Sequence, residues 1–219
     1  MKAGYRQEVS AITKTGEEPS NREGPRGPSQ RLRLLGIAPL MFFMAHLLFY
    51  VSDPSYASTD GVQNMLWMCN VGNLMLAAGL LLGSPRVIRL AVIWLVPGLP
   101  LWVFDAVLRG GLLFTSFLTH IGGLAVGLIA MRRVRADRWT WLYGLGWYLL
   151  VQQASRLLTS EYWNVNVSHR VYPGYEKVVS QYWQFWLLTS AMVAVGLFVL
   201  GFIMIKLFPP RAASSSFER

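Results

Sequence analysis

The chain has 219 residues, of which 53% are hydrophobic and only 14% are charged, and its formal net charge is +9. Soluble globular domains carry roughly 25% charged residues, so this composition excludes an ordinary soluble domain. The basic residues stand in short loops beside apolar runs, a pattern that indicates a membrane protein rather than a nucleic-acid-binding protein.

Residues 1–33 are rich in Ser, Gly, Pro, Glu, Lys and Arg and contain almost no apolar cluster. This composition predicts a disordered basic cytoplasmic tail. No small-residue cleavage site follows the first apolar run, so we expect that run to remain as an anchor. Residues 209–219 are expected to form a second, short cytoplasmic tail.

Six apolar runs follow the tail and give the chain its organisation. They cover residues 34–51, 65–83, 87–108, 112–131, 140–158 and 183–208. Runs of this length can cross a hydrocarbon core of ~30 Å at 1.5 Å per residue. The alternating segments of ~10 residues that build a transmembrane barrel do not occur. The sequence therefore predicts an all-α fold, with residues 34–208 forming one bundle of six transmembrane helices.

The Lys and Arg residues of the predicted loops fall unequally on the two sides of this bundle. Eleven belong to one side: Arg26, Arg31, Arg33, Arg86, Arg89, Arg132, Arg133, Arg135, Arg138, Lys206 and Arg211. Three belong to the other side: Arg109, Arg170 and Lys177. Because basic loops stay in the cytoplasm, we expect both termini to be cytoplasmic. In a bacterium the membrane would be the plasma membrane.

The only cysteine, Cys69, lies at nearly the same predicted depth as His120 and Asp105. Cys69 and His120 differ in depth by only about 6 Å at 1.5 Å per residue. His46 falls in the same outer half of the bundle. Ionisable groups inside a membrane are costly, so each needs a partner, a water-filled cavity or a functional role.

A cysteine beside a histidine is suited to acyl transfer. His120 would accept the thiol proton of Cys69 and return it to a leaving alcohol. Asp105 could orient an imidazole, or pair with Arg109 four residues further on. The amide side chains that could donate to an oxyanion are Asn70, Asn73 and Gln152. The alternative for Asn73 and Gln152 is that their amides only link helices.

Three short motifs resemble a known family of membrane proteins. They are the cysteine segment 67–70 (Trp-Met-Cys-Asn), the histidine segment 120–123 (His-Ile-Gly-Gly) and the segment 161–164 (Glu-Tyr-Trp-Asn). Their order resembles the bacterial YwaF-like six-helix integral membrane proteins. That family is related to a cysteine-dependent transmembrane phospholipid acyltransferase, and distantly to the androgen-induced protein threonine hydrolases.

The resemblance covers residues 65–208 and implies a nucleophile on the second helix that works with a histidine on the fourth. Carried over to this chain, these residues are Cys69 and His120, and Asn164 of the third motif is a further candidate for an oxyanion or orienting role. The chain departs from the family pattern at Met68 and Asn70, which flank the cysteine, and at Ile121, which is inserted after the histidine.

The leading prediction is therefore a membrane lipid acyltransferase or esterase that uses Cys69 and His120 in the outer half of the bilayer. Membrane lipids would be its partners, and the sequence is also compatible with a homo-oligomer. One alternative is a non-catalytic lipid-binding, transport or accessory protein, which the Pro-Gly-Leu-Pro segment 97–100 and the glycine-rich fourth helix would also suit.

A second alternative is haem-binding electron transfer, with His46 and His120 as axial ligands. The chain has no glycine loop that would bind phosphate and no strong set of metal ligands, so no nucleotide or metal cofactor is expected. Asn166-Val167-Ser168 forms a glycosylation sequon on the outer side, which applies only in a eukaryote.

Overall fold

The computed structural model describes residues 30–109 and 113–210, and these residues form helices and no strand. The longer helices are α2 (Ile37–Ser52), α4 (Met68–Leu81), α5 (Pro85–Arg109), α7 (Gly123–Val134), α8 (Thr140–Leu158) and α9 (Tyr182–Leu207). Short turns precede or join them: α1 (Gln30–Leu34), α3 (Pro54–Ala57), η1 (Gly61–Leu66), α6 (Phe114–Phe117), η2 (Leu118–Gly122) and η3 (Val165–Val167). The all-α prediction is confirmed. Most of both predicted tails, residues 1–29 and 211–219, lies outside the described residues.

Each of the six predicted apolar segments overlaps one of these helices, and the starts of the first two segments differ most from the prediction. Helix α8 has the predicted bounds. The first helical segment starts at Gln30 rather than at residue 34. The second starts at Met68 rather than at residue 65, because the Asn64 side chain donates to Gly61 O and accepts from Trp67 Nε1. These bonds hold residues 61–66 in a 3-10 turn.

Four helical segments of the described chain are long and apolar enough to cross a membrane. They are residues 30–52, 85–107, 114–134 and 182–207. Helix α4 is apolar but has only 14 residues. Helix α8 is long enough, but Gln152, Gln153 and Arg156 make it more polar than the four candidates. These segments are consistent with an integral multi-pass membrane protein.

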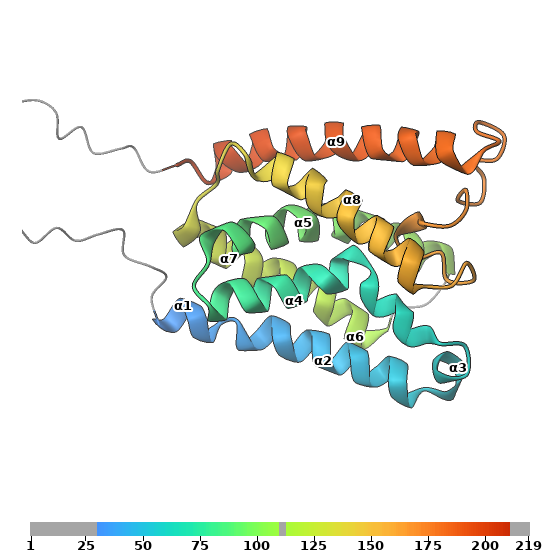
Figure 1. Ribbon diagram of the computed structural model, residues 1–219. Helices are drawn as coiled ribbons and strands as arrows, with labels where there is room; N and C mark the ends of the chain where they lie inside the picture. The colour runs from blue at the N-terminus through green and yellow to red at the C-terminus, as the bar shows by residue number, and fades with distance from the viewer. Residues whose placement is uncertain (1–29, 110–112, 211–219) are drawn as a thin grey trace, which may run out of the picture.

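The long helices alternate in direction, so α1 and the C-terminal end of α9 lie at the same end of the bundle (Figure 1). The connections at this end are joined by hydrogen bonds. Arg89 at the start of α5 donates to Val134 O, in the last residue of α7, and to Arg135 O, in the next residue. The Ala136 N–H donates to Phe208 O at the end of α9. We call this the basic end, because most of the arginines that predicted the orientation stand in its connections.

Glycines allow α4, α5 and α7 to approach closely in the centre of the bundle. A Cβ at Gly79 of α4 would lie 2.9 Å from the backbone N of Ile88, and one at Gly127 of α7 would lie 2.8 Å from Val92 Cγ2. Leu76 and Leu80 of α4 are fully buried in the resulting core. In contrast, α2 and α9 expose many large apolar side chains, as helices in contact with lipid do.

At the opposite end, the connection between α8 and α9 folds over the start of α4. The Asn166 side chain accepts from Met68 N and donates to Leu66 O and Ser155 Oγ. Asn166 is 6% exposed and its amide is occupied at both ends. The sequon asparagine is therefore inaccessible to a glycosylating enzyme once the chain has folded.

The close approach of α4 to α5 gives a stability prediction. Gly79→Ala should lower the free energy of unfolding by about 1–3 kcal/mol, because the new methyl group meets the α5 backbone, which cannot move aside cheaply. The measurement is unfolding in detergent by circular dichroism. The matched control is Gly146→Ala in α8, where no atom lies within 4 Å of the new Cβ. Equal stability of the two variants would contradict the close approach.

Candidate functional site

One face of α5 connects the predicted site residues. Gly98, Trp102 and Asp105 are spaced four and three residues apart, so they share a face of the helix. A Cβ at Gly98 would lie 3.6 Å from the Cβ of Cys69 on α4. The Trp102 ring stacks on the His120 ring, with centroids 4.9 Å apart and an interplanar angle of 12°. Cys69 and His120 therefore contact neighbouring turns of the same α5 face.

Helix α5 continues through this face despite containing two prolines. Pro97 and Pro100 lack the N–H groups that would donate to Ile93 O and Val96 O. Between them, Gly98 has no side chain to keep Cys69 at a distance. The Pro-Gly-Leu-Pro segment thus supplies the part of α5 on which the cysteine lies.

His120 is 6% exposed and its Nδ1 lies 2.8 Å from Ser116 O. A carbonyl oxygen can only accept a hydrogen bond, so Nδ1 carries the proton of the neutral ring. The lone pair is consequently on Nε2. This tautomer leaves Nε2 as the atom that can accept a proton.

His46 of α2 belongs to the same polar cluster. Its side chain is 3% exposed, and its Nδ1 lies 2.9 Å from Thr115 Oγ1 of α6. The ring is also within electrostatic range of His120. The structure thus brings together two of the three histidines. The third, His169, hydrogen-bonds Thr159 Oγ1 in the connection after α8.

Cys69 is the second residue of α4 and is half-buried. The backbone N–H groups of Cys69 and Asn70 lie near its thiol. Donors in the first turn of a helix favour the thiolate form of a cysteine, whereas burial in apolar surroundings disfavours it. Within the described ranges, no hydrogen bond joins this thiol to the His120 ring.

The two asparagines of α4 make different hydrogen bonds. Asn73 donates both N–H groups of Nδ2, one to Cys69 O at 2.9 Å and one to Thr119 O at 2.8 Å. It therefore has no donor left for an oxyanion. Asn70 donates to Asn64 O at 3.0 Å and keeps a second N–H.

The two remaining candidates hydrogen-bond elsewhere. Gln152 of α8 accepts from Trp186 Nε1 of α9 at 2.6 Å. Asn164 accepts from His169 N and Arg170 N and donates to Arg170 O, so it stabilises its own loop. Asp105 lies on the shared α5 face, and the side chain of Arg109 lies outside the described part of the chain.

Sequence reasoning missed Trp102 and Thr115. Trp102 lies four residues after Gly98, a spacing that would have placed both on one face. Thr115 directly precedes Ser116 at the start of the fourth apolar run, and nothing in the pattern distinguished it from other polar residues near a helix end.

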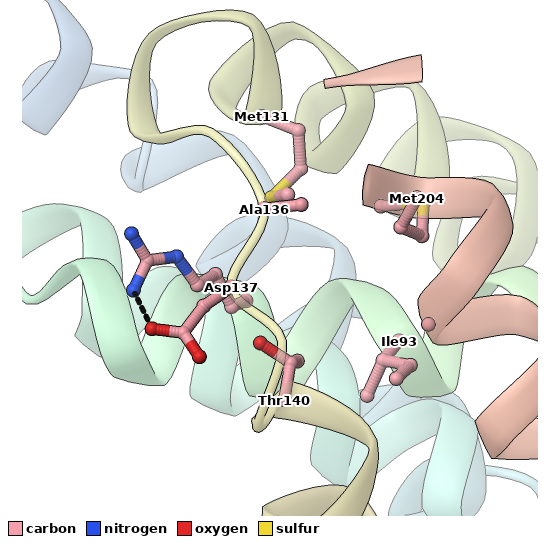
Figure 2. Close-up of a pocket in the computed structure, with 8 residues that line it drawn as sticks. Ile93, Met131, Ala136, Asp137, Thr140 and Met204 are labelled. Atoms are coloured by element: carbon pink, nitrogen blue, oxygen red, sulfur yellow. Dashed lines mark hydrogen bonds and ion pairs between the residues drawn. The ribbon is translucent and has the colours of Figure 1, made fainter. Parts of the chain in front are cut away.

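A pocket at the basic end is separate from this cluster. It is lined by Arg89, Asp137 and Thr140 together with apolar side chains of α5, α7 and α9 (Figure 2). Arg89 Nη1 lies 3.4 Å from Asp137 Oδ2 and the same guanidinium binds the carbonyls at the end of α7. These bonds supply donors to carbonyl groups at the C-terminal end of α7, which is a structural role.

Comparisons with known proteins identify no relative of this chain. No protein-family model, no curated protein and no solved structure matches the chain.

The contact between Asn73 and η2 gives a second stability prediction. A Cβ at Gly123 would overlap Asn73 Oδ1 and lie 2.9 Å from its Cγ, and its three nearest atoms all belong to this one side chain. Gly123→Ala should therefore lower the free energy of unfolding by about 1–3 kcal/mol. In an Asn73→Ala background, the same Gly123→Ala change should cost much less, because the obstructing atoms are gone. A thermal unfolding cycle of the four proteins measures this, and purely additive effects would contradict the contact.

Proposed function

We propose that this chain is a six-span membrane enzyme that transfers an acyl group from a lipid ester through Cys69 and His120. The observation that carries the proposal is the geometry of His120. Its Nδ1 proton is directed at Ser116 O, which leaves Nε2 free as a base, and its ring stacks one turn along α5 from the contact with Cys69. Catalytic hydrogen bonds are often long before substrate binds, so the pair is expected to close on the substrate.

The reaction proceeds in two balanced steps. In the first, the Cys69 thiol gives its proton to His120 Nε2 and the sulfur attacks the ester carbonyl. The C–S bond forms, the C–O bond breaks, and the proton passes to the leaving alcohol. In the second, water or another alcohol loses its proton to Nε2 and attacks the thioester, and the thiol recovers its proton as the C–S bond breaks.

Two further features support this chemistry. The backbone N–H groups in the first turn of α4 lie near the sulfur and would offset part of the cost of forming a buried thiolate. The second N–H of Asn70 is the amide donor suited to the oxyanion, since both N–H groups of Asn73 are already used. The likeness of the cysteine and histidine segments to the YwaF-like family agrees with the same pair of residues.

The proposal includes the topology. With α4 and α8 added to the four apolar candidates, the bundle spans the membrane six times, and the basic end faces the cytoplasm. Cys69 and His120 are then in the outer half of the bilayer. An acyl chain would lie between helices, with its ester near the outer headgroups.

Intact-mass analysis after incubation with phospholipid vesicles tests the chemistry. The wild-type protein should gain a mass equal to one acyl chain, and hydroxylamine should remove it because thioesters are labile to that reagent. Cys69→Ala should abolish the adduct, and His120→Gln should slow its formation by roughly 100-fold, the usual contribution of a general base. The control is His169→Gln, a histidine outside the cluster. An adduct that persists in Cys69→Ala would contradict the proposal.

Cysteine labelling in intact cells tests the topology. In a Cys69→Ser background, Ser58→Cys follows α3 and Ser84→Cys precedes α5, so they mark opposite ends of the bundle. A membrane-impermeant maleimide should label Ser58→Cys in intact cells and Ser84→Cys only after permeabilisation. The reverse pattern would show that the basic end faces outward.

A further inference from the structure

The helix that carries His120 is not a regular α-helix. Residues 118–122 form a π-turn, and the Gly123 N–H is shared between Leu118 O, five residues back, and His120 O. In an α-helix this N–H would donate to Thr119 O. A π-turn contains one residue more than an α-turn and is costly enough that it needs a specific cause.

Asn73 supplies that cause. Its Nδ2 donates to Thr119 O at 2.8 Å and to Cys69 O at 2.9 Å, and the side chain is completely buried. Thr119 O thus accepts from α4 in place of the N–H of its own helix. The opposite amide orientation would turn Oδ1 toward two carbonyl oxygens, so the hydrogen bonds fix the orientation.

Gly123 completes the arrangement. It is the residue after the π-turn, and any side chain there would overlap the Asn73 amide. The amide therefore occupies space that only glycine leaves open. Asn73, Gly123 and the extra residue of the π-turn depend on one another.

We infer that Asn73 is a positioning residue: its amide enters the helix at Thr119, produces the π-turn and so determines the direction in which His120 points. In a regular α-helix the added residue would rotate the segment that precedes it relative to α7, and the π-turn prevents this rotation. In this register the His120 ring stacks on Trp102 of α5. The structural inference stands without the proposed chemistry, and its consequence for activity rests on the proposed function.

Deleting Ile121 provides the test, because it removes the one extra residue. Ile121 is 36% exposed, so the deletion removes little packing. Without it, the same Gly123-to-Leu118 hydrogen bond closes an ordinary α-turn and Thr119 O recovers a donor from its own helix. The residues before and after the turn then remain on the same helix faces as in the wild-type protein.

The experiment is a cycle of unfolding midpoints in detergent for wild type, Asn73→Leu, the Ile121 deletion and the double variant. Asn73→Leu leaves Thr119 O without its donor, and the deletion leaves one of the two N–H groups of the Asn73 amide without its acceptor. Each should lower the midpoint by about 4 °C or more, the effect of losing one or two buried hydrogen bonds. The double variant should be more stable than either single variant. Additive losses would overturn the inference.

A matched deletion controls for the general cost of removing a residue. Ile129 is 49% exposed in the regular helix α7. Deleting Ile129 rotates the rest of the helix. This deletion should lower the unfolding midpoint by the same amount whether position 73 is Asn or Leu. Rescue of this deletion by Asn73→Leu would also overturn the inference.

The acyl adduct gives the readout that a merely structural role would not change. Asn73→Leu should slow adduct formation in protein that remains folded, and the double variant should recover it, because His120 regains its direction. If the unfolding cycle shows coupling and no variant forms an adduct, the proposed function fails and the positioning role stands. If the midpoints are additive while wild type forms the adduct, the positioning role fails and the function stands.

Discussion

The arrangement depends on two backbone carbonyls, those of Cys69 and Thr119, which share one amide group. Inside a bundle surrounded by lipid, a carbonyl without a donor costs free energy that no water can recover. Asn73 donates to both oxygens and so ties the start of α4 to the turn that carries His120. This tie brings the two helices into one register and requires glycine at position 123.

The surrounding helices supply the rest of the cluster. Helix α5 presents Gly98 to the cysteine and Trp102 to the histidine, and α2 contributes His46 through its bond to Thr115. The polar groups are thus enclosed by four helices rather than scattered through the membrane. The basic end performs a different task, since its arginines satisfy helix ends. Separating the two ends in this way is consistent with a reactive group in one leaflet and an orientation signal in the other.

Much of the fold could be predicted from the sequence, because apolar runs and their interruptions are local features. The bounds of α8 follow from its apolar run, since polar residues flank it closely. The start of α4 was placed three residues early, because the side chain of Asn64 holds a 3-10 turn that hydropathy cannot detect. The polarity of α8 likewise comes from residues that hydrogen-bond inside the bundle, such as Gln152.

The residues of the candidate site could be predicted from the sequence, but the hydrogen bonds that join them could not. The depths of Cys69, His120 and His46 follow from counting residues along each helix. The role of Asn73 as a link between helices, rather than as an oxyanion donor, depends on the place of Thr119, 46 residues later in the chain. The π-turn is equally hidden, since its cause lies on another helix. Patterns within one helix cannot show which partner its polar side chains will meet.

Thiol cross-linking shows whether Cys69 and His120 face one site. Because Cys69 is the only native cysteine, His120→Cys creates a single pair. Dibromobimane, a short bifunctional reagent, becomes strongly fluorescent when it bridges two thiols. If the two residues face one site, the reagent should bridge the pair in His120→Cys and bridge little in Ile121→Cys, because the Ile121 side chain is 36% exposed on the neighbouring face. Equal or stronger bridging in Ile121→Cys would contradict a shared site.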